Sequence, residues 1–208
     1  MQLQNYYYWF KNAIPHHVCD DIVRYAKSIQ DEMAVTGGLG DRKLNKKEVQ
    51  DLKKKRDSDI VWLNERWIYN AIHPFIHQAN RDANWNFQWD FSESCQFTKY
   101  KKGQYYDWHC DSWDKPYQRQ QGDPSNGKQR KLSVTLSLSD DKDYSGGELE
   151  FDMRNMDPDK KANTHVLKEI RSKGSLVVFP SDVWHRVKPV KRGVRHSLVI
   201  WNLGSPFK

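Results

Sequence analysis

The stretch Leu132-Ser133-Val134-Thr135-Leu136-Ser137-Leu138-Ser139 alternates strictly between aliphatic and hydroxyl side chains. Because successive side chains of a strand point to opposite faces, this pattern predicts a half-buried β-strand. The same period of two returns over 149–153, and further short strands are expected at 165–170, 175–179, 184–187 and 195–203, with turns such as 191–193 between them. Many short strands at close spacing are typical of a β-sandwich or a jelly roll.

The first 80 or so residues are predicted to be mainly helical. Apolar residues at 18, 22, 26 and 29, and again at 68, 71, 72, 75, 76 and 79, follow helical spacing, whereas 59–63 is expected as a short strand. We therefore expect one domain over 1–208, with helical support over about 1–85 and a mainly β core over about 86–208.

Composition excludes several classes of protein. The chain has 208 residues and is 13% aromatic, which argues against general disorder even though only 37% of it is hydrophobic. No apolar run reaches the length of a transmembrane helix, and no signal peptide is visible at the start. Three cysteines form a sparse, odd set that is typical of reduced thiols. We expect a soluble cytoplasmic protein without membrane contact.

The net charge of +7 is concentrated between Arg42 and Arg56, where basic residues strongly outnumber Glu48 and Asp51. This stretch is compatible with a surface that contacts nucleic-acid phosphates, but a solvated loop and helix face is favoured because no base-reading residues accompany it. The polar segment 112–131 is expected to be a long surface loop, and it and the glycine-containing segment 37–56 are possible lids for a bound peptide.

His109 and Asp111 are two residues apart in an aromatic stretch. On a strand, residues i and i+2 share a face, so an imidazole and a carboxylate can converge on one ion. His185 is the best third ligand in the remaining sequence. Two histidines and one carboxylate leave coordination positions open, as in non-haem Fe(II) oxygenases. A hydrogen-bonded position in an aromatic strand is the alternative for His109 alone.

Arg195 opens the last predicted strand, ten residues after His185. A guanidinium that points into the interior needs a planar anion, because an unpaired buried charge is unfavourable. A dicarboxylate cosubstrate would supply that anion through a bidentate pair. The alternative is an ordinary surface arginine at the start of a strand. Trp108 and Trp184 flank the predicted ligands and are expected either to wall the pocket or to pack in the core.

Five segments in this order, 100–111, 132–140, 143–149, 174–181 and 185–201, make the chain resemble the Fe(II)/2-oxoglutarate-dependent dioxygenases. The resemblance is to the prolyl 4-hydroxylase-like branch, which includes the bacterial PKHD-type hydroxylases. It implies a double-stranded β-helix, a jelly-roll barrel packed against N-terminal helices. It also implies Fe(II), 2-oxoglutarate and O2 as cofactor and cosubstrates, with ascorbate as a further requirement.

The resemblance assigns His109, Asp111 and His185 as catalytic iron ligands, Arg195 to the distal carboxylate of 2-oxoglutarate, and Tyr100 to a hydrogen bond with this cosubstrate. Ser137 stands where several prolyl hydroxylases have a cosubstrate-binding tyrosine. The expected function is hydroxylation of an unactivated C–H bond, first of all in a peptidyl proline of a peptide or protein. The alternatives are a 2-oxoglutarate oxygenase that acts on nucleic acid and a non-catalytic metal-binding β-barrel.

Overall fold

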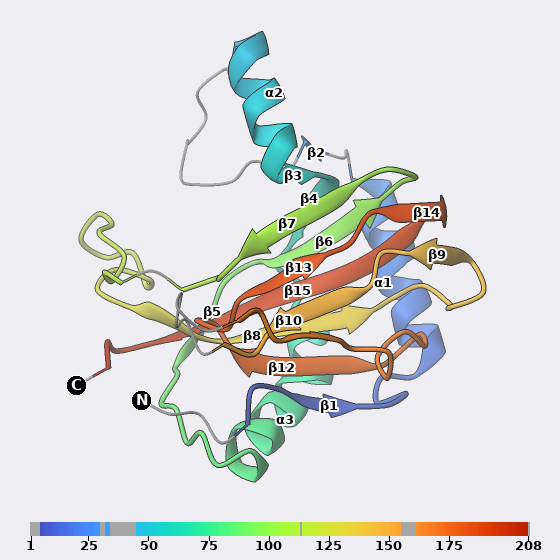
Figure 1. Ribbon diagram of the computed structural model, residues 1–208. Helices are drawn as coiled ribbons and strands as arrows, with labels where there is room; N and C mark the ends of the chain where they lie inside the picture. The colour runs from blue at the N-terminus through green and yellow to red at the C-terminus, as the bar shows by residue number, and fades with distance from the viewer. Residues whose placement is uncertain (1–4, 30–31, 34–44, 113, 155–160, 208) are drawn as a thin grey trace.

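A computed structural model describes residues 5–29, 32–33, 45–112, 114–154 and 161–207 of the chain (Figure 1). Within these ranges three helices form, α1 (His16–Ser28), α2 (Lys46–Lys55) and α3 (Arg66–Asp82). The rest of the regular structure is β-strand, and every pair of neighbouring strands is antiparallel. In this part of the chain no helix is long and apolar enough to span a bilayer.

The strands form one large sheet, one smaller sheet and a separate pair. The eight-stranded sheet has the order β1 (Tyr8–Phe10), β12 (Leu176–Pro180), β8 (Gln129–Ser137), β15 (Arg195–Gly204), β6 (Cys95–Tyr100), β4 (Asp59–Leu63) and β2 (Glu32–Met33), with β5 (Phe91–Ser92) beside β15. The five-stranded sheet has the order β11 (Thr164–Val166), β10 (Leu149–Asp152), β13 (His185–Val187), β7 (Tyr105–His109) and β3 (Arg56–Asp57). The remaining pair is β14 (Val190–Gly193) and β9 (Tyr144–Gly146). This mainly β arrangement is consistent with a jelly roll.

Alternation along the central strands separates two buried clusters. The even-numbered residues 132, 134 and 136 of β8, with 198 and 200 of β15, share one cluster with residues of α1 and α3 such as Ile22 and Ile72. The apolar faces of these helices are buried against the sheet. Each large apolar side chain that is fully buried stabilises the folded protein by roughly 1.5–3 kcal/mol. Figure 1 shows both helices on the same side of the large sheet.

The other face of the large sheet looks toward the smaller sheet. A second cluster there contains residues of both sheets, among them Tyr100, Phe179, Phe151 and Val187. The hydroxyl face of β8 is also buried, with Ser133, Thr135 and Ser137 exposed by only 0%, 6% and 2%. The prediction of a half-buried strand was therefore wrong on this point, because the polar face of β8 meets an interior polar site and not solvent.

Several predicted boundaries need correction. The predicted strand 165–170 is limited to β11, and 191–193 forms strand β14 instead of a turn. The predicted loop 112–131 ends earlier, because β8 already begins at Gln129. The mainly helical N-terminal part also contributes strands, since β1 lies at one edge of the large sheet and the predicted strand 59–63 is confirmed as β4. The glycine-rich part of segment 37–56 lies outside the described residues, and the single-domain organisation stays a prediction.

Candidate functional site

The predicted metal ligands come from adjacent strands of the smaller sheet. His109 ends β7 and His185 begins β13, and the two residues are direct partners in the register of this pair. Asp111 follows β7, where its backbone N–H donates to the carbonyl of Ser181 at 2.8 Å. One donor atom from each of the three residues lies within 4.8 Å of the other two. Within the described residues no other set of histidine, cysteine and carboxylate side chains meets this condition.

Hydrogen bonds orient both imidazoles. Nδ1 of His109 lies 2.7 Å from the carbonyl oxygen of Asp107, and Nδ1 of His185 lies 2.9 Å from that of Val183. Because a carbonyl only accepts, Nδ1 carries a proton in each ring, so the lone pair of the neutral imidazole lies on Nε2. These Nε2 atoms lie 3.7 and 3.6 Å from the two carboxylate oxygens of Asp111. The three donors therefore converge on one point.

Asp111 is 6% exposed, and its carboxylate accepts a hydrogen bond from a side chain of β8. The Ser133 hydroxyl donates to Oδ2 at 2.7 Å, and the Ser181 hydroxyl lies 2.9 Å from that of Ser133. Burial alone would raise the pKa of Asp111, but neighbouring groups, with His185 first among them, hold it below its ordinary value. The carboxylate is therefore ionised at neutral pH.

His109 is suited to donate a lone pair at neutral pH. Burial and then the neighbouring His185 lower the pKa of His109 to about 3, so its imidazole is neutral. The ring of Tyr106 stacks on it with centroids 3.5 Å apart, and Phe179 packs edge-on against His185 at 4.7 Å. Aromatic packing on both rings restricts their rotation, which favours a preformed ligand set.

The three residues line a pocket between the two sheets, together with residues that are distant in sequence. The other lining residues are Arg56, Gln96, Tyr100, Tyr106, Thr135, Leu149, Val187, Arg195, Ser197, Val199 and Trp201. A second, open depression on the helical side is lined by Asp21, Arg24, Tyr25, Ser28 and Trp67, and it contains no histidine. We place the candidate site between the sheets, where the titratable groups gather.

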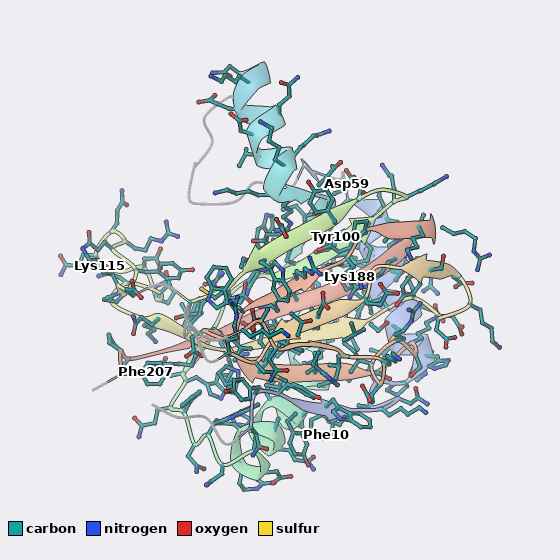
Figure 2. All side chains as sticks on the ribbon, viewed as in Figure 1. Phe10, Asp59, Tyr100, Lys115, Lys188 and Phe207 are labelled. Carbon is teal, nitrogen blue, oxygen red and sulfur yellow. The ribbon has the colours of Figure 1, made fainter. Side chains whose placement is uncertain are left out.

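Arg195 is 3% exposed and lies in the same pocket. Its guanidinium donates to the Ser197 hydroxyl at 3.1 Å and lies 5.5 Å from the centroid of the Tyr100 ring. No carboxylate of the described residues forms an ion pair with it. A buried cation with only neutral partners fits an incoming carboxylate, because an unpaired buried charge is unfavourable. Figure 2 labels Tyr100 among the strands beside this pocket.

The structure separates some predicted residues from the site. Ser137 is not among the lining residues, and its hydroxyl donates to the carbonyl oxygens of Arg171 and Ser139. Trp184 is 38% exposed, and Trp108 lies under the Arg186 guanidinium at 4.6 Å. Neither tryptophan is among the residues that line the pocket. Trp108 precedes His109 on β7, so strand alternation turns it away from the face of this ligand.

The sequence reading missed much of the pocket wall. Ser197, Val199 and Trp201 share the parity of Arg195 on β15, so alternation could have predicted them. Arg56 had been counted as part of an exposed basic stretch, but it is 5% exposed and lines the pocket. No local signal could have placed it there, because its position depends on the pairing of β3 with β7.

Two histidines and a carboxylate on a mainly β scaffold, beside a buried arginine, define the class of metal-dependent oxygenases with a two-histidine, one-carboxylate ligand set. The family model described as "2OG-Fe(II) oxygenase superfamily" matches residues 95–202. The chain belongs to this superfamily, and the resemblance described in the sequence analysis is confirmed.

Individual comparisons agree with this membership. The chain is 32% identical over 108 residues to a PKHD-type hydroxylase of Cupriavidus metallidurans, an alignment that covers 50% of this chain and 40% of the relative. The chain thus matches less than half of the relative's length. The structure of a Pseudomonas putida prolyl-4-hydroxylase shares the fold, with a TM-score of 0.65, 19% identity and coverage of 96% and 92%. A prolyl hydroxylase from Trichoplax adhaerens, solved with a hypoxia inducible factor peptide fragment, gives 0.63 at 16% identity, with coverage of 96% and 84%.

Proposed function

We propose that this protein is an Fe(II)- and 2-oxoglutarate-dependent dioxygenase that hydroxylates an unactivated C–H bond, first of all in a peptidyl proline. His109, Asp111 and His185 would hold the iron, and Arg195 and Tyr100 would bind 2-oxoglutarate. One observation carries the proposal: two Nε2 lone pairs and a buried carboxylate converge beside a buried guanidinium that has no carboxylate partner among the described residues.

The donor set fits Fe(II) in kind and number. Neutral imidazoles and a carboxylate suit this ion, and three protein ligands leave room for a chelating cosubstrate and O2. The hydrogen bonds to both Nδ1 atoms and from Ser133 to Asp111 are the outer contacts that such sites use to orient their ligands. The pocket is closed on two sides by sheets, which restricts the access of water.

Bound iron, together with 2-oxoglutarate and O2, supplies the oxidising chemistry that no side chain provides. The chain itself contributes orientation and binding. Arg195 holds the distal carboxylate of the cosubstrate, Tyr100 lies beside it on β6, and the apolar side chains Leu149, Val187 and Val199 shield the reacting region. We also propose that the two sheets form the double-stranded β-helix barrel of the family, supported by α1 and α3.

A peptide is the favoured substrate. The Trichoplax relative was solved with a peptide fragment, and the relatives with this fold include prolyl hydroxylases. In this chain the loop before β8, where Figure 2 labels Lys115, projects beyond the strand ends and could cover a bound chain. The Tyr117 hydroxyl and the Arg130 guanidinium both donate to the carboxylate of Glu93, which fixes this loop at its base.

The free state of all three cysteines supports a reducing compartment such as the cytoplasm.

Succinate formation tests the proposal. Wild-type protein with Fe(II), 2-oxoglutarate, ascorbate and O2 should produce succinate, and a mixture of proline-containing peptides should increase the rate. The variant His109→Ala should lose this turnover, whereas His17→Ala, which changes an exposed histidine of α1, should keep it. Absence of both succinate and 2-oxoglutarate binding in the wild type would refute the proposal and favour the non-catalytic barrel.

A further inference from the structure

The pocket contains a second buried arginine that the proposed chemistry leaves unused. Arg56 is 5% exposed and lines the pocket from β3. Its Nε donates to the Ser58 hydroxyl at 3.0 Å and one terminal nitrogen donates to Oε1 of Gln96 at 2.6 Å. Its guanidinium also lies 4.5 Å from the centroid of the Tyr106 ring. All of these partners are neutral, and no carboxylate of the described residues forms an ion pair with Arg56.

The position of Arg56 is close to the reaction centre. The Tyr106 ring that it contacts stacks directly on His109, a proposed metal ligand. Arg56 and Tyr106 are also register partners in the β3–β7 pair. The Tyr106 ring thus lies between Arg56 and His109. A carboxylate bound by Arg56 would therefore be close to the metal ligands, as expected if it belongs to a residue adjacent to the one that reacts.

The charge balance of the pocket assigns Arg56 a partner. Its charged lining residues are Arg56, Arg195 and Asp111. With the proposed cofactors bound, the Asp111 carboxylate and the two carboxylates of 2-oxoglutarate balance the iron ion and Arg195. The charge of Arg56 is the one that remains. A buried charge without a counter-ion is unfavourable, so the complete complex needs one more anionic group.

We propose that the substrate is a peptide with an aspartate or glutamate next to the reacting residue, and that Arg56 binds its carboxylate. This inference rests on the proposed function and specifies its substrate. The approach to Arg56 has the matching charge, because exposed lysines 53–55 form the last turn of α2 directly before it. The Tyr105 hydroxyl donates to the carbonyls of Lys53 and Lys54, which attaches this turn to β7.

A peptide library separates this inference from the proposed function. Heptapeptides that are random at every position are equilibrated with immobilised wild-type protein, Mn²⁺ and 2-oxoglutarate under nitrogen, and the retained peptides are sequenced by mass spectrometry. Enrichment of proline reports on the proposed function. Enrichment of aspartate or glutamate at a fixed distance from the enriched centre reports on Arg56. Binding is the readout, so the result does not depend on turnover.

Three variants complete the experiment. Arg56→Gln should lose the acidic preference, and Arg56→Lys should retain part of it. Lys11→Gln should behave as the wild type, because Lys11 is exposed and follows β1 at the opposite edge of the large sheet. For a single retained peptide, replacing its acidic residue by the amide should weaken wild-type binding about 10- to 100-fold, the range of a charge-assisted hydrogen bond. The same replacement should have no effect on binding to Arg56→Gln.

Two results would overturn the inference. One is that the wild-type protein retains no excess of acidic peptides. This result is obtained without any variant. The other is an acidic preference that persists in Arg56→Gln when this variant still binds 2-oxoglutarate normally. If Arg56→Gln does not fold, the amide replacement in the peptide, measured with the wild type and Arg56→Lys, decides the question.

Discussion

Replacing Arg195 by methionine should separate cosubstrate binding from folding and from metal binding. Arg195 is 3% exposed and makes one hydrogen bond, to Ser197, with no carboxylate partner in the described chain. Methionine keeps most of the side-chain volume and removes the charge. Because a hydrogen bond to a charged group contributes about 1.5–3 kcal/mol, the loss should weaken 2-oxoglutarate binding about 10- to 100-fold.

The same change should not destabilise the ligand-free protein, because it removes a buried charge that has no counter-ion in the part of the chain that the structure describes. Isothermal titration of 2-oxoglutarate into Mn²⁺-loaded protein under nitrogen measures the affinity, and urea unfolding measures the stability. At one fixed concentration of 2-oxoglutarate, the melting temperature of the wild type should rise more than that of Arg195→Met, because the variant binds this ligand more weakly. Arg192→Met, which changes an exposed residue of β14, is the control. Unchanged 2-oxoglutarate affinity, or a loss of metal binding with 2-oxoglutarate binding retained, would refute this role of Arg195.

Three further changes test the surroundings of the site. Ser133→Ala removes the hydrogen bond to Asp111 and should weaken metal binding about 10- to 100-fold in a competition titration. Gly147→Ala should lower the free energy of unfolding in urea by about 1–2 kcal/mol, because φ of Gly147 is +64°. The variant should also bind 2-oxoglutarate more weakly, because the new Cβ would lie 3.0 Å from Cδ of Arg195. His196 has its pKa lowered to about 4, mainly by burial, so the unfolded chain binds the proton more readily. Its contribution to stability is therefore complete above pH 6.5 and is lost as the pH falls toward 4, and His196→Gln should reduce this pH dependence of urea unfolding.

Each of these changes has a control in the chain. Ser137→Ala alters a hydroxyl that donates to backbone carbonyls away from Asp111, and metal affinity should stay unchanged. Gly103→Ala also places alanine at a positive φ, but nothing lies within 4 Å of the new Cβ, so 2-oxoglutarate binding should be retained. His17→Gln replaces an exposed histidine and should leave the fall in stability between pH 6.5 and 4 in place. Equal effects in a variant and its control would contradict the corresponding argument.

The local pattern of the chain was sufficient for most elements. The helices predicted from apolar spacing are present as α1 and α3, with Ile22 and Ile72 fully buried. The strands predicted at 59–63, 175–179 and 195–203 correspond to β4, β12 and β15. The helices were predictable because apolar residues at helical spacing mark the side that is buried, and β12 was predictable because it is a short apolar run between turn residues. The strand β1 was missed because three residues carry too short a pattern.

The role of each face was not predictable in the same way. On β8 the pattern distinguishes aliphatic from hydroxyl positions, but it does not say that the hydroxyl face is buried against a second sheet. Ser133 therefore reads as a surface residue in the sequence, whereas in the structure it supports Asp111. Charge patterns were also ambiguous, because Arg56 stands at the end of a lysine-rich stretch and yet turns inward.

The sequence by itself determined the period of the strands and helices, the membership of the superfamily, and the candidate ligands His109, Asp111 and His185. These properties depend on residue type and spacing, which are local or shared by a family. The tertiary structure decided that Nε2 of each histidine faces Asp111 and that Arg56 enters the pocket. Such details depend on strand pairing between residues far apart in the chain, and pairing is set by the packing of the whole fold.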